Sequence, residues 1–334
     1  MRRPTDTGTA SAAGLAPPPP GPGPGAAVAT GDRIWDIGLV AIGSGVVLVA
    51  GLIVFELSRT AAPAIDSIGI VPFVTGSDWD PVSDRFGALP FLYGTVVTSA
   101  VALTLALPVS VGLALFLAEM GPAFLRRPVS FAIETLAAIP SVVYGLWGLF
   151  VLVPVLRSPV EPFLARTLGF LPLFRGPPIG LGYLAAGIVL AIMILPTIAS
   201  VTLDVLRTVP LPLREGALAL GATRWEMIRI SVLPYARPGI VGAALLGLGR
   251  ALGETMAVAM VIGNSPGIHA SLFSPGYTLP AVLANEFSEA TGAVHVGALA
   301  GLGLVLLGLT VLLNAAARLM LVLTTQRFMR RAAA

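Results

Sequence analysis

Six long apolar stretches, separated by polar segments, dominate the hydrophobic pattern of this 334-residue chain. Each stretch is long enough to cross the roughly 30 Å hydrocarbon layer of a bilayer as an α-helix, which rises about 1.5 Å per residue. The predicted spans are Ile34 to Glu56, Gly94 to Ala118, Val129 to Val153, Leu181 to Leu203, Gly239 to Ile262 and Gly297 to Leu321. The pattern therefore predicts an all-α integral membrane protein with six transmembrane helices.

The chain is predicted to consist of an N-terminal tail and one transmembrane domain. Residues 1–31 are rich in Pro, Gly, Ala and Thr and have no hydrophobic period, so we expect a disordered cytoplasmic tail. Residues 32–334 form one predicted six-helix transmembrane domain. Pro108, Pro140 and Pro196 fall inside the second, third and fourth spans, where neighbouring helices can satisfy the backbone groups that proline frees.

The composition fits a bilayer and excludes several kinds of chemistry. Hydrophobic residues make up 56% of the chain and charged residues 11%, whereas a soluble domain carries about a quarter charged residues. There is no cysteine, and the two histidines, His269 and His295, are too few and too far apart in sequence to indicate a metal site. All 20 basic residues are arginine, so the chain lacks the lysine of a nucleotide-binding P-loop and is not predicted to be a P-loop ATPase.

Arginine placement predicts the orientation of the spans. With the N-terminus inside, 14 arginines fall in cytoplasmic segments and 5 in outside segments, and Arg250 is left within the membrane. Cytoplasmic loops of membrane proteins carry such an excess. We therefore expect both termini in the cytoplasm.

Three side chains near the predicted membrane boundaries have simple interpretations. Glu134 lies about one and a half turns inside the predicted third span, and we expect its carboxylate to snorkel to the cytoplasmic interface. Trp79 in the first outside loop and Trp147 near the outer end of the third span are typical of interfacial anchors.

The longest predicted cytoplasmic loop, about residues 205–238, carries local signals for two short helices. Small residues favour a helix from Glu215 to Leu220, and Gly221 can end it in the left-handed conformation. Thr223 can cap the next helix, with Glu226 three residues later as its capping-box partner. The product is a compact helix–turn–helix at the cytoplasmic face.

The same loop predicts a surface for a partner. Pro234 is expected to stop the second helix before the membrane, leaving Trp225, Met227 and Ile228 available for contact. An ordinary interfacial loop would show the same tryptophan and arginines. On the residues alone, a docking element and such a loop both remain open.

The predicted fifth span contains two charges. Arg250 and Glu254 are four residues apart and would share one face of a continuous helix. Charges in the membrane are costly and usually face a bundle interior or an aqueous path. The arginine fork suits a phosphate oxyanion, which Glu254 could replace when the path is empty or help to release. A structural ion pair that fixes helix packing is the alternative.

The loop resembles the EAA loop of ABC importer permeases through Glu215-Gly-Ala, Gly221 and Leu233-Pro234. Gly216 stands where that family usually has alanine. The resemblance implies that the loop docks in a groove of a cytoplasmic ATPase. The residues implied for this coupling are Glu215, Gly216, Ala217, Gly221, Thr223, Trp225 and Glu226.

Longer motifs resemble the PstC-type permeases of high-affinity phosphate importers, and they cover nearly everything after the tail. They are Phe86 to Thr95, Ala138 to Phe150, Gly247 to Val258 with Val261 to Asn264, and Leu283 to Phe287. In that family the residues matching Arg250 and Glu254 are associated with transport.

This resemblance implies a type I ABC importer permease that forms half of a phosphate pathway, a multi-pass protein of the plasma (inner) membrane of a prokaryote. It also implies that the chain is a transport subunit and not an enzyme. Its implied partners are a homologous second permease, two ATP-binding subunits, an extracytoplasmic phosphate-binding protein, phosphate and membrane lipid. ATP and Mg would bind to the ATPase, and no cofactor, catalytic residue or nucleic acid is expected for this chain. The alternatives are a stand-alone secondary anion transporter or channel, which would leave the loop unexplained, and a membrane-embedded enzyme, for which the histidines are poorly placed.

Overall fold

The computed structural model describes residues 26–332, so the predicted tail up to residue 25 lies outside the described residues. The chain forms two compact units, Met1–Val54 and Phe55–Ala334. The first unit contains the beginning of helix α1 (Ala26–Ile68), and the second contains the end of α1 and the elements that follow. The two sites considered below belong to the second unit.

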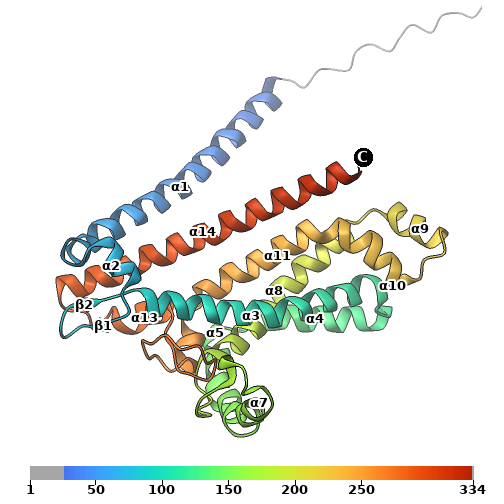
Figure 1. The fold of residues 1–334 in the computed structure, drawn as a ribbon. Coiled ribbons are helices and arrows are strands. Elements are labelled where there is room, and N and C mark those ends of the chain that lie inside the picture. The colour runs from blue at the N-terminus through green and yellow to red at the C-terminus, as the bar shows by residue number, and fades with distance from the viewer. Residues whose placement is uncertain (1–25, 333–334) are drawn as a thin grey trace, which may run out of the picture. The chain divides into compact units, whose positions relative to one another are not determined.

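The described chain is mostly helical (Figure 1). After α1, the helices are α2 (Ile70–Thr75), α3 (Leu89–Leu115), α4 (Ala123–Ala138), α5 (Ser141–Trp147), α6 (Val153–Val155), α7 (Glu161–Leu168), α8 (Tyr183–Arg207), α9 (Leu211–Ala219), α10 (Arg224–Met227), α11 (Leu233–Gly253), α12 (Met256–Val261), α13 (Leu279–Glu286) and α14 (Ala293–Ala332). A two-stranded antiparallel hairpin joins β1 (Trp79–Asp80) to β2 (Arg85–Phe86).

Single π-helical turns continue several of these helices. They span Phe116–Met120, Gly148–Leu152, Leu156–Val160 and Ile228–Val232, and a short 3₁₀ turn spans Pro172–Phe174. A π-helical turn adds a residue to the helix and occurs often at functional sites. Two of these turns, Phe116–Met120 and Ile228–Val232, adjoin the loop of α9 and α10 described below.

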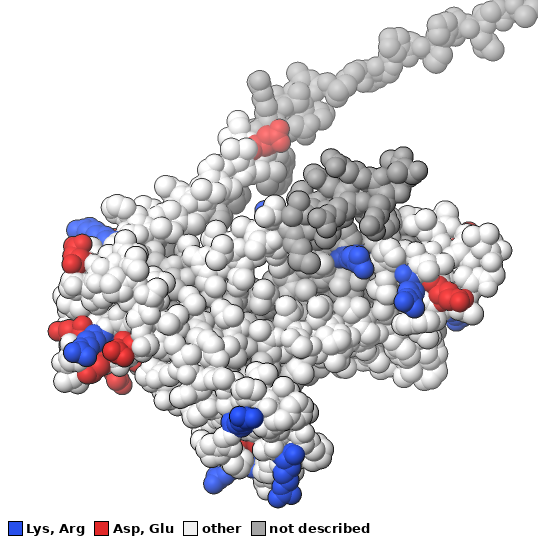
Figure 2. Space-filling model, viewed as in Figure 1, with Lys and Arg blue, Asp and Glu red and all other residues white. Residues whose placement is uncertain are grey.

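Six helical segments among the described residues are long and apolar enough to cross a membrane, as the sequence predicts. They are Trp35–Ile68, Leu89–Met120, Ser141–Leu168, Tyr183–Arg207, Arg224–Gly253 and Ala293–Leu319. Charged side chains of the second unit gather over the β1–β2 hairpin, around α7 and toward the α9–α10 end, and the helix flanks between are almost uncharged (Figure 2). This distribution matches helices that pass through lipid.

The predicted third span, Val129 to Val153, is wrong in its position. The helix breaks at Ile139 and Pro140, and the membrane-length segment begins at Ser141. Ile139 has an extended backbone because the following proline disfavours the helical conformation. The Tyr144 hydroxyl spans the break by donating to the Leu136 carbonyl oxygen at 2.7 Å.

Residues 129–138 belong instead to α4, which packs beside α8. Glu134 is exposed on α4, so its predicted place inside the third span is also wrong.

The predicted fifth span, Gly239 to Ile262, is shifted in the same way. Its membrane-length segment runs from Arg224 to Gly253, and α12 is a separate short helix after a break. Pro234 does not stop the helix, contrary to the prediction. It is in the first turn of α11, directly after the π-helical turn Ile228–Val232, where its missing N–H is tolerated.

Helix α8 is at the centre of the second unit and packs along α3 and α11, as Figure 1 shows. About two thirds of its most apolar window is buried, the largest fraction of the six segments. Its buried side chains include Tyr183, Leu190, Ile194 and Ile198. The helices that surround α8 therefore position both candidate sites.

Trp79, expected as an interfacial anchor, is half-buried in an aromatic cluster at the end opposite α9. Its ring meets the rings of Phe86 and Phe91 edge-on, and its Nε1 donates to Glu286 Oε2 at 2.8 Å. His295 stacks on Phe86, and its Nε2 lies 3.5 Å from the same Glu286 oxygen. These contacts fasten the β1–β2 hairpin to α13 and α14.

Two groups near this hairpin have shifted acidity. Hydrogen bonds from the Ser83 hydroxyl and the Val82 amide hold the pKa of Asp80 below its usual value. Burial raises the pKa of Tyr277, whose hydroxyl accepts a hydrogen bond from Asn285 at 3.0 Å. The first effect comes from hydrogen bonds on an exposed turn and the second from burial, and both groups lie in loops that join the spans.

Candidate functional site

The loop between α8 and α11, predicted to be cytoplasmic, folds as two short helices, α9 and α10, in the order the sequence predicts. Helix α9 begins at Leu211, four residues before the predicted Glu215. Pro212 in its first turn supplies a backbone angle that suits a helix start and needs no N–H partner there. The structure thus lengthens the first helix toward α8.

The turn between the two helices has the predicted glycine cap. Gly221 has a φ of 85°, in the left-handed region. Its amide donates to the Leu218 carbonyl at 3.0 Å, and the Ala222 amide donates to the Ala217 carbonyl at 3.2 Å. This pair of bonds is a Schellman motif, which satisfies carbonyls that the end of a helix otherwise leaves without partners.

The predicted capping box of α10 is also confirmed. The Thr223 hydroxyl accepts from the Glu226 amide at 3.3 Å, and the Thr223 amide donates to Glu226 Oε2 at 2.7 Å. Two consecutive caps within five residues fix the angle between α9 and α10. The loop therefore has a defined helix–turn–helix structure rather than an irregular one.

The exposed side of this element differs in part from the prediction. Trp225 is 57% exposed and Leu220 90% exposed, and Glu215, Gly216, Gly221, Thr223 and Glu226 are also exposed. Met227 and Ile228 are buried, so their predicted availability to a partner is wrong. Ala217 faces inward as well, because it packs in the core beneath the loop.

Sequence reasoning missed Arg214 of α9. Its guanidinium donates to Glu119 Oε1 from Nη2 at 2.9 Å and from Nε at 3.1 Å. The only sequence signals were a basic residue directly before Glu215 and an acidic residue at the end of the second predicted span. Nothing local relates two residues 95 positions apart.

The two charges of the predicted fifth span do not share a helix face. Helix α11 ends at Gly253, and the extended backbone of Glu254 turns the chain away from the helical path. The ion pairs among the described residues are Arg207–Asp204, Arg214–Glu119 and His295–Glu286. The alternative of an Arg250–Glu254 pair that fixes helix packing is therefore not supported by the structure.

Each charge has a different partner. Arg250 is exposed in the last turn of α11, and its Nη1 donates to the Thr197 hydroxyl of α8 at 3.5 Å. Glu254 is half-buried and accepts a hydrogen bond from the Ala257 amide at 3.3 Å, at the start of α12. The carboxylate thus holds the break between the helices, and the guanidinium contacts a different helix, α8.

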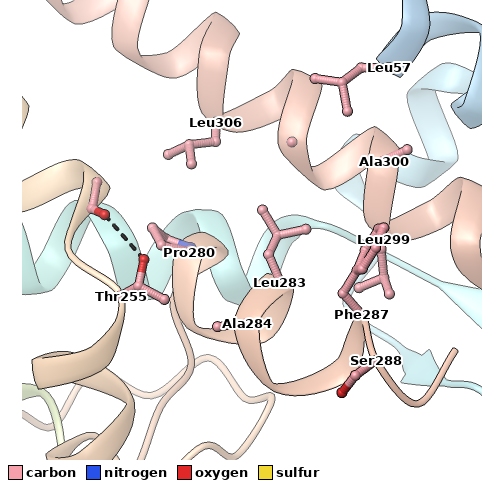
Figure 3. A pocket seen from close by; sticks show the side chains of 12 residues that line it. Leu57, Thr255, Pro280, Leu283, Ala284, Phe287, Ser288, Leu299, Ala300 and Leu306 are labelled. Atoms are coloured by element: carbon pink, nitrogen blue, oxygen red, sulfur yellow. Dashed lines mark hydrogen bonds between the residues drawn. The ribbon is translucent and has the colours of Figure 1, made fainter. Parts of the chain in front are cut away.

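The break between α11 and α12 also borders an open groove of about 680 Å³ (Figure 3). Gly253 and Thr255 line it, and the Thr255 hydroxyl donates to the Gly253 carbonyl at 3.3 Å. Apolar side chains of α13 and α14 form most of the remaining wall. The groove offers space beside the break, but its lining does not suit an anion.

Comparison with known proteins gives the family. Residues 110–328 match the model of the family described as binding-protein-dependent transport system inner membrane component. The chain is 48% identical to the phosphate transport system permease protein PstC of Mesorhizobium japonicum, with 83% of this chain and 85% of the relative aligned. It is 52% identical to the PstC protein of Xylella fastidiosa over 75% of this chain and 78% of the relative.

A relative in Methanocaldococcus jannaschii, a probable PstC, is 38% identical over 79% of this chain and 85% of the relative. Among solved structures, a bacterial ABC transporter that imports the polysaccharide alginate has a similar fold, with a TM-score of 0.56 at 19% identity, over 86% of this chain and 96% of that chain. The fold of a type I ABC importer permease, the six spans and the family model agree on a multi-pass inner-membrane protein without enzymatic activity of its own. The chain belongs to the PstC family of binding-protein-dependent transport permeases.

Proposed function

We propose that this chain is a transmembrane permease subunit of an ATP-driven importer of inorganic phosphate. The observation that carries the proposal is its similarity to several PstC phosphate transport permeases over at least three quarters of its length. The doubly capped loop of α9 and α10 supports it, because that loop is a rigid exposed element at the end of the spans. A transporter that works alone has no use for such a docking element.

As an ABC importer permease, the chain works with an ATP-hydrolysing subunit and a substrate-binding protein. We propose that its finer partners are a homologous second permease, two ATP-binding subunits and an extracytoplasmic phosphate-binding protein. ATP and Mg bind to the ATP-binding subunits, and this chain contributes no cofactor. The α9–α10 loop presents Leu220 and Trp225 to the ATPase.

The proposed pathway passes Arg250. An exposed arginine in a membrane-length helix is costly against lipid, so we place it at the interface with the second permease, on the aqueous path. Thr197 occupies one donor of the guanidinium at a long distance, which leaves donors available for a phosphate oxyanion. Glu254 anchors the start of α12, so a change in the angle between α11 and α12 alters the approach to Arg250.

The partner assignment is tested by isolating the chain from native membranes. The proposal predicts a complex with two ATP-binding subunits and one related permease. It also predicts that phosphate-loaded binding protein stimulates ATP hydrolysis by that complex, and that sulfate-loaded binding protein does not. A chain isolated alone and still active in phosphate transport would contradict the proposal.

A further inference from the structure

Arg214 makes four hydrogen bonds to three different parts of the chain. Besides its two bonds to Glu119 Oε1, it donates from Nη2 to the Leu206 carbonyl oxygen at 2.8 Å and from Nη1 to the Val209 carbonyl oxygen at 2.5 Å. The side chains are 18% exposed for Arg214 and 8% exposed for Glu119. Both ends of this ion pair are therefore held in one geometry.

The contacts join the cytoplasmic loop to two membrane-length segments. Arg214 lies in α9, and Glu119 lies in the π-helical turn Phe116–Met120 that ends the second segment. Leu206 lies in the last turn of α8, where helix carbonyls lack partners within the helix. Figure 1 shows α9 beside this end of the helices. One side chain thus connects α9 with both α3 and α8.

The surroundings make this connection stiff. Leu117, Leu206, Val209, Ala217 and Ile228 form one buried apolar cluster around the loop. Ionic hydrogen bonds are stronger away from water, and loss of one partner leaves a charge without compensation. Breaking the contact therefore costs far more than breaking an ion pair in solvent.

A second arginine–carboxylate pair, exposed to solvent, serves as a control for the Arg214–Glu119 pair. Arg207 and Asp204 lie on the same end of α8, 3.5 Å apart, with side chains that are 65% and 75% exposed. Exposed pairs of this type contribute little to stability. Arg207 is thus a control for the loss of one arginine at the same face of the protein.

We infer that Arg214 and Glu119 form the rigid connection through which movement of α9 is transmitted to α3 and α8. They are positioning residues for coupled transport and do not contact phosphate or ATP. The inference rests on the proposed function, because it requires α9 to be moved by an ATPase. In this inference Arg214 transmits the movement, and the exposed residues of the loop dock to the ATPase.

The test uses the complete importer complex in proteoliposomes. Phosphate-loaded binding protein is supplied on the extracytoplasmic side of the complex, and ATP on the side of the ATP-binding subunits. Arg214→Gln and Glu119→Gln are expected to lower the yield of complex, because each leaves a charge without its partner, and to keep basal ATP hydrolysis per assembled complex. The phosphate moved per ATP hydrolysed should fall about fivefold or more, the usual lower range for loss of coupling between sites. Arg207→Gln should match the wild type.

Arg214→Lys separates transmission from folding. Lysine keeps the charge opposite Glu119 but cannot hold the carboxylate and both carbonyl oxygens with a planar fork. We expect normal yield and a ratio of phosphate to ATP between those of the wild type and Arg214→Gln. If Arg214→Gln fails to assemble, Arg214→Lys decides: wild-type coupling overturns the inference, and reduced coupling at normal yield supports it.

A distance measurement gives a second readout, since the chain has no cysteine of its own. Spin labels at Leu211 in α9 and Leu105 in α3, both exposed, report whether the two helices move together. The distance should be equal in nucleotide-free and ATP-bound wild-type complexes and should differ between these states in Arg214→Gln. A distance that stays fixed in Arg214→Gln would overturn the inference.

Different results would overturn the transmission role of Arg214 and the proposed function. A wild-type complex that imports phosphate with ATP, together with a fully coupled Arg214→Gln complex, overturns the transmission role and leaves the proposed function standing. A wild-type complex with no ATP-dependent phosphate import overturns the proposed function, and the inference with it.

Discussion

Arg250 and Glu254 are four residues apart, yet the end of α11 at Gly253 separates them, and they do not form an ion pair. Arg250 reaches Thr197 on α8, and Glu254 accepts from the first turns of α12. The two charges therefore do different work. Arg250 is exposed and contacts α8, and Glu254 fixes a break in the helix.

This separation predicts the behaviour of charge-removing variants. Because neither side chain neutralises the other, Arg250→Gln and Glu254→Gln should each reach near-normal membrane abundance, measured by immunoblot, as should the double variant. Phosphate uptake should be lost whenever Arg250 is changed to glutamine. Arg250→Lys should also fall well short of wild type, because an ammonium group lacks the two-pronged geometry of a guanidinium.

The contrary result is equally clear. A single variant that disappears from the membrane but returns when both charges are removed would show that the two residues pair in the working protein. Recovery of uptake in that double variant would remove Arg250 from the pathway.

The loop offers two glycines with opposite expectations. Gly221 has a φ of 85°, so Gly221→Ala should cost roughly 1–2 kcal/mol and disturb the angle between α9 and α10. Gly216 is helical, and a Cβ there meets nothing within 4 Å, so Gly216→Ala should stabilise α9 by about 0.5–1 kcal/mol.

Co-purification with the ATPase is the measurement for both glycine variants. We expect Gly221→Ala to reduce the ATPase recovered with the chain and Gly216→Ala to leave it unchanged or raised. Equal recovery in the two variants would mean that the left-handed cap is unimportant for docking.

The α9–α10 loop and the membrane spans show which features can be predicted from neighbouring residues in the sequence. Run length gave six spans, and capping residues gave the Schellman turn at Gly221 and the box at Thr223, because both depend on neighbours within a few residues. The third span was wrongly extended across Pro140, and the break at Gly253 was missed, because apolar runs do not report the contacts at these positions, such as the bond of Tyr144 to Leu136. Arg214 was missed because its carboxylate partner is distant in sequence.

The β1–β2 hairpin has its own prediction. Since Trp79 donates to Glu286, Glu286→Ala should release the β1–β2 hairpin from α13. A cysteine placed at exposed Ser77 should then be labelled faster by a thiol reagent than the same cysteine in the wild-type background. Asp78→Ala, on the same loop, is the control and should leave the labelling rate unchanged.

Orientation remains a prediction from the arginine distribution, and the chain is well suited to test it. Cysteines at Ser77 and Ser158 should react with an impermeant thiol reagent added to intact cells, and a cysteine at Thr208 should react only after the membrane is opened. All three positions are exposed. Labelling of the Thr208 position in sealed cells would reverse the assigned topology.

The most direct test of the central claim is phosphate uptake in a strain that lacks its own PstC-type permease and expresses this chain with its partner subunits. We predict that radiolabelled phosphate accumulates in these cells and that accumulation stops when the partner ATPase is inactivated. Accumulation that continues without ATP hydrolysis, or that is no greater than in cells without the chain, would contradict the account.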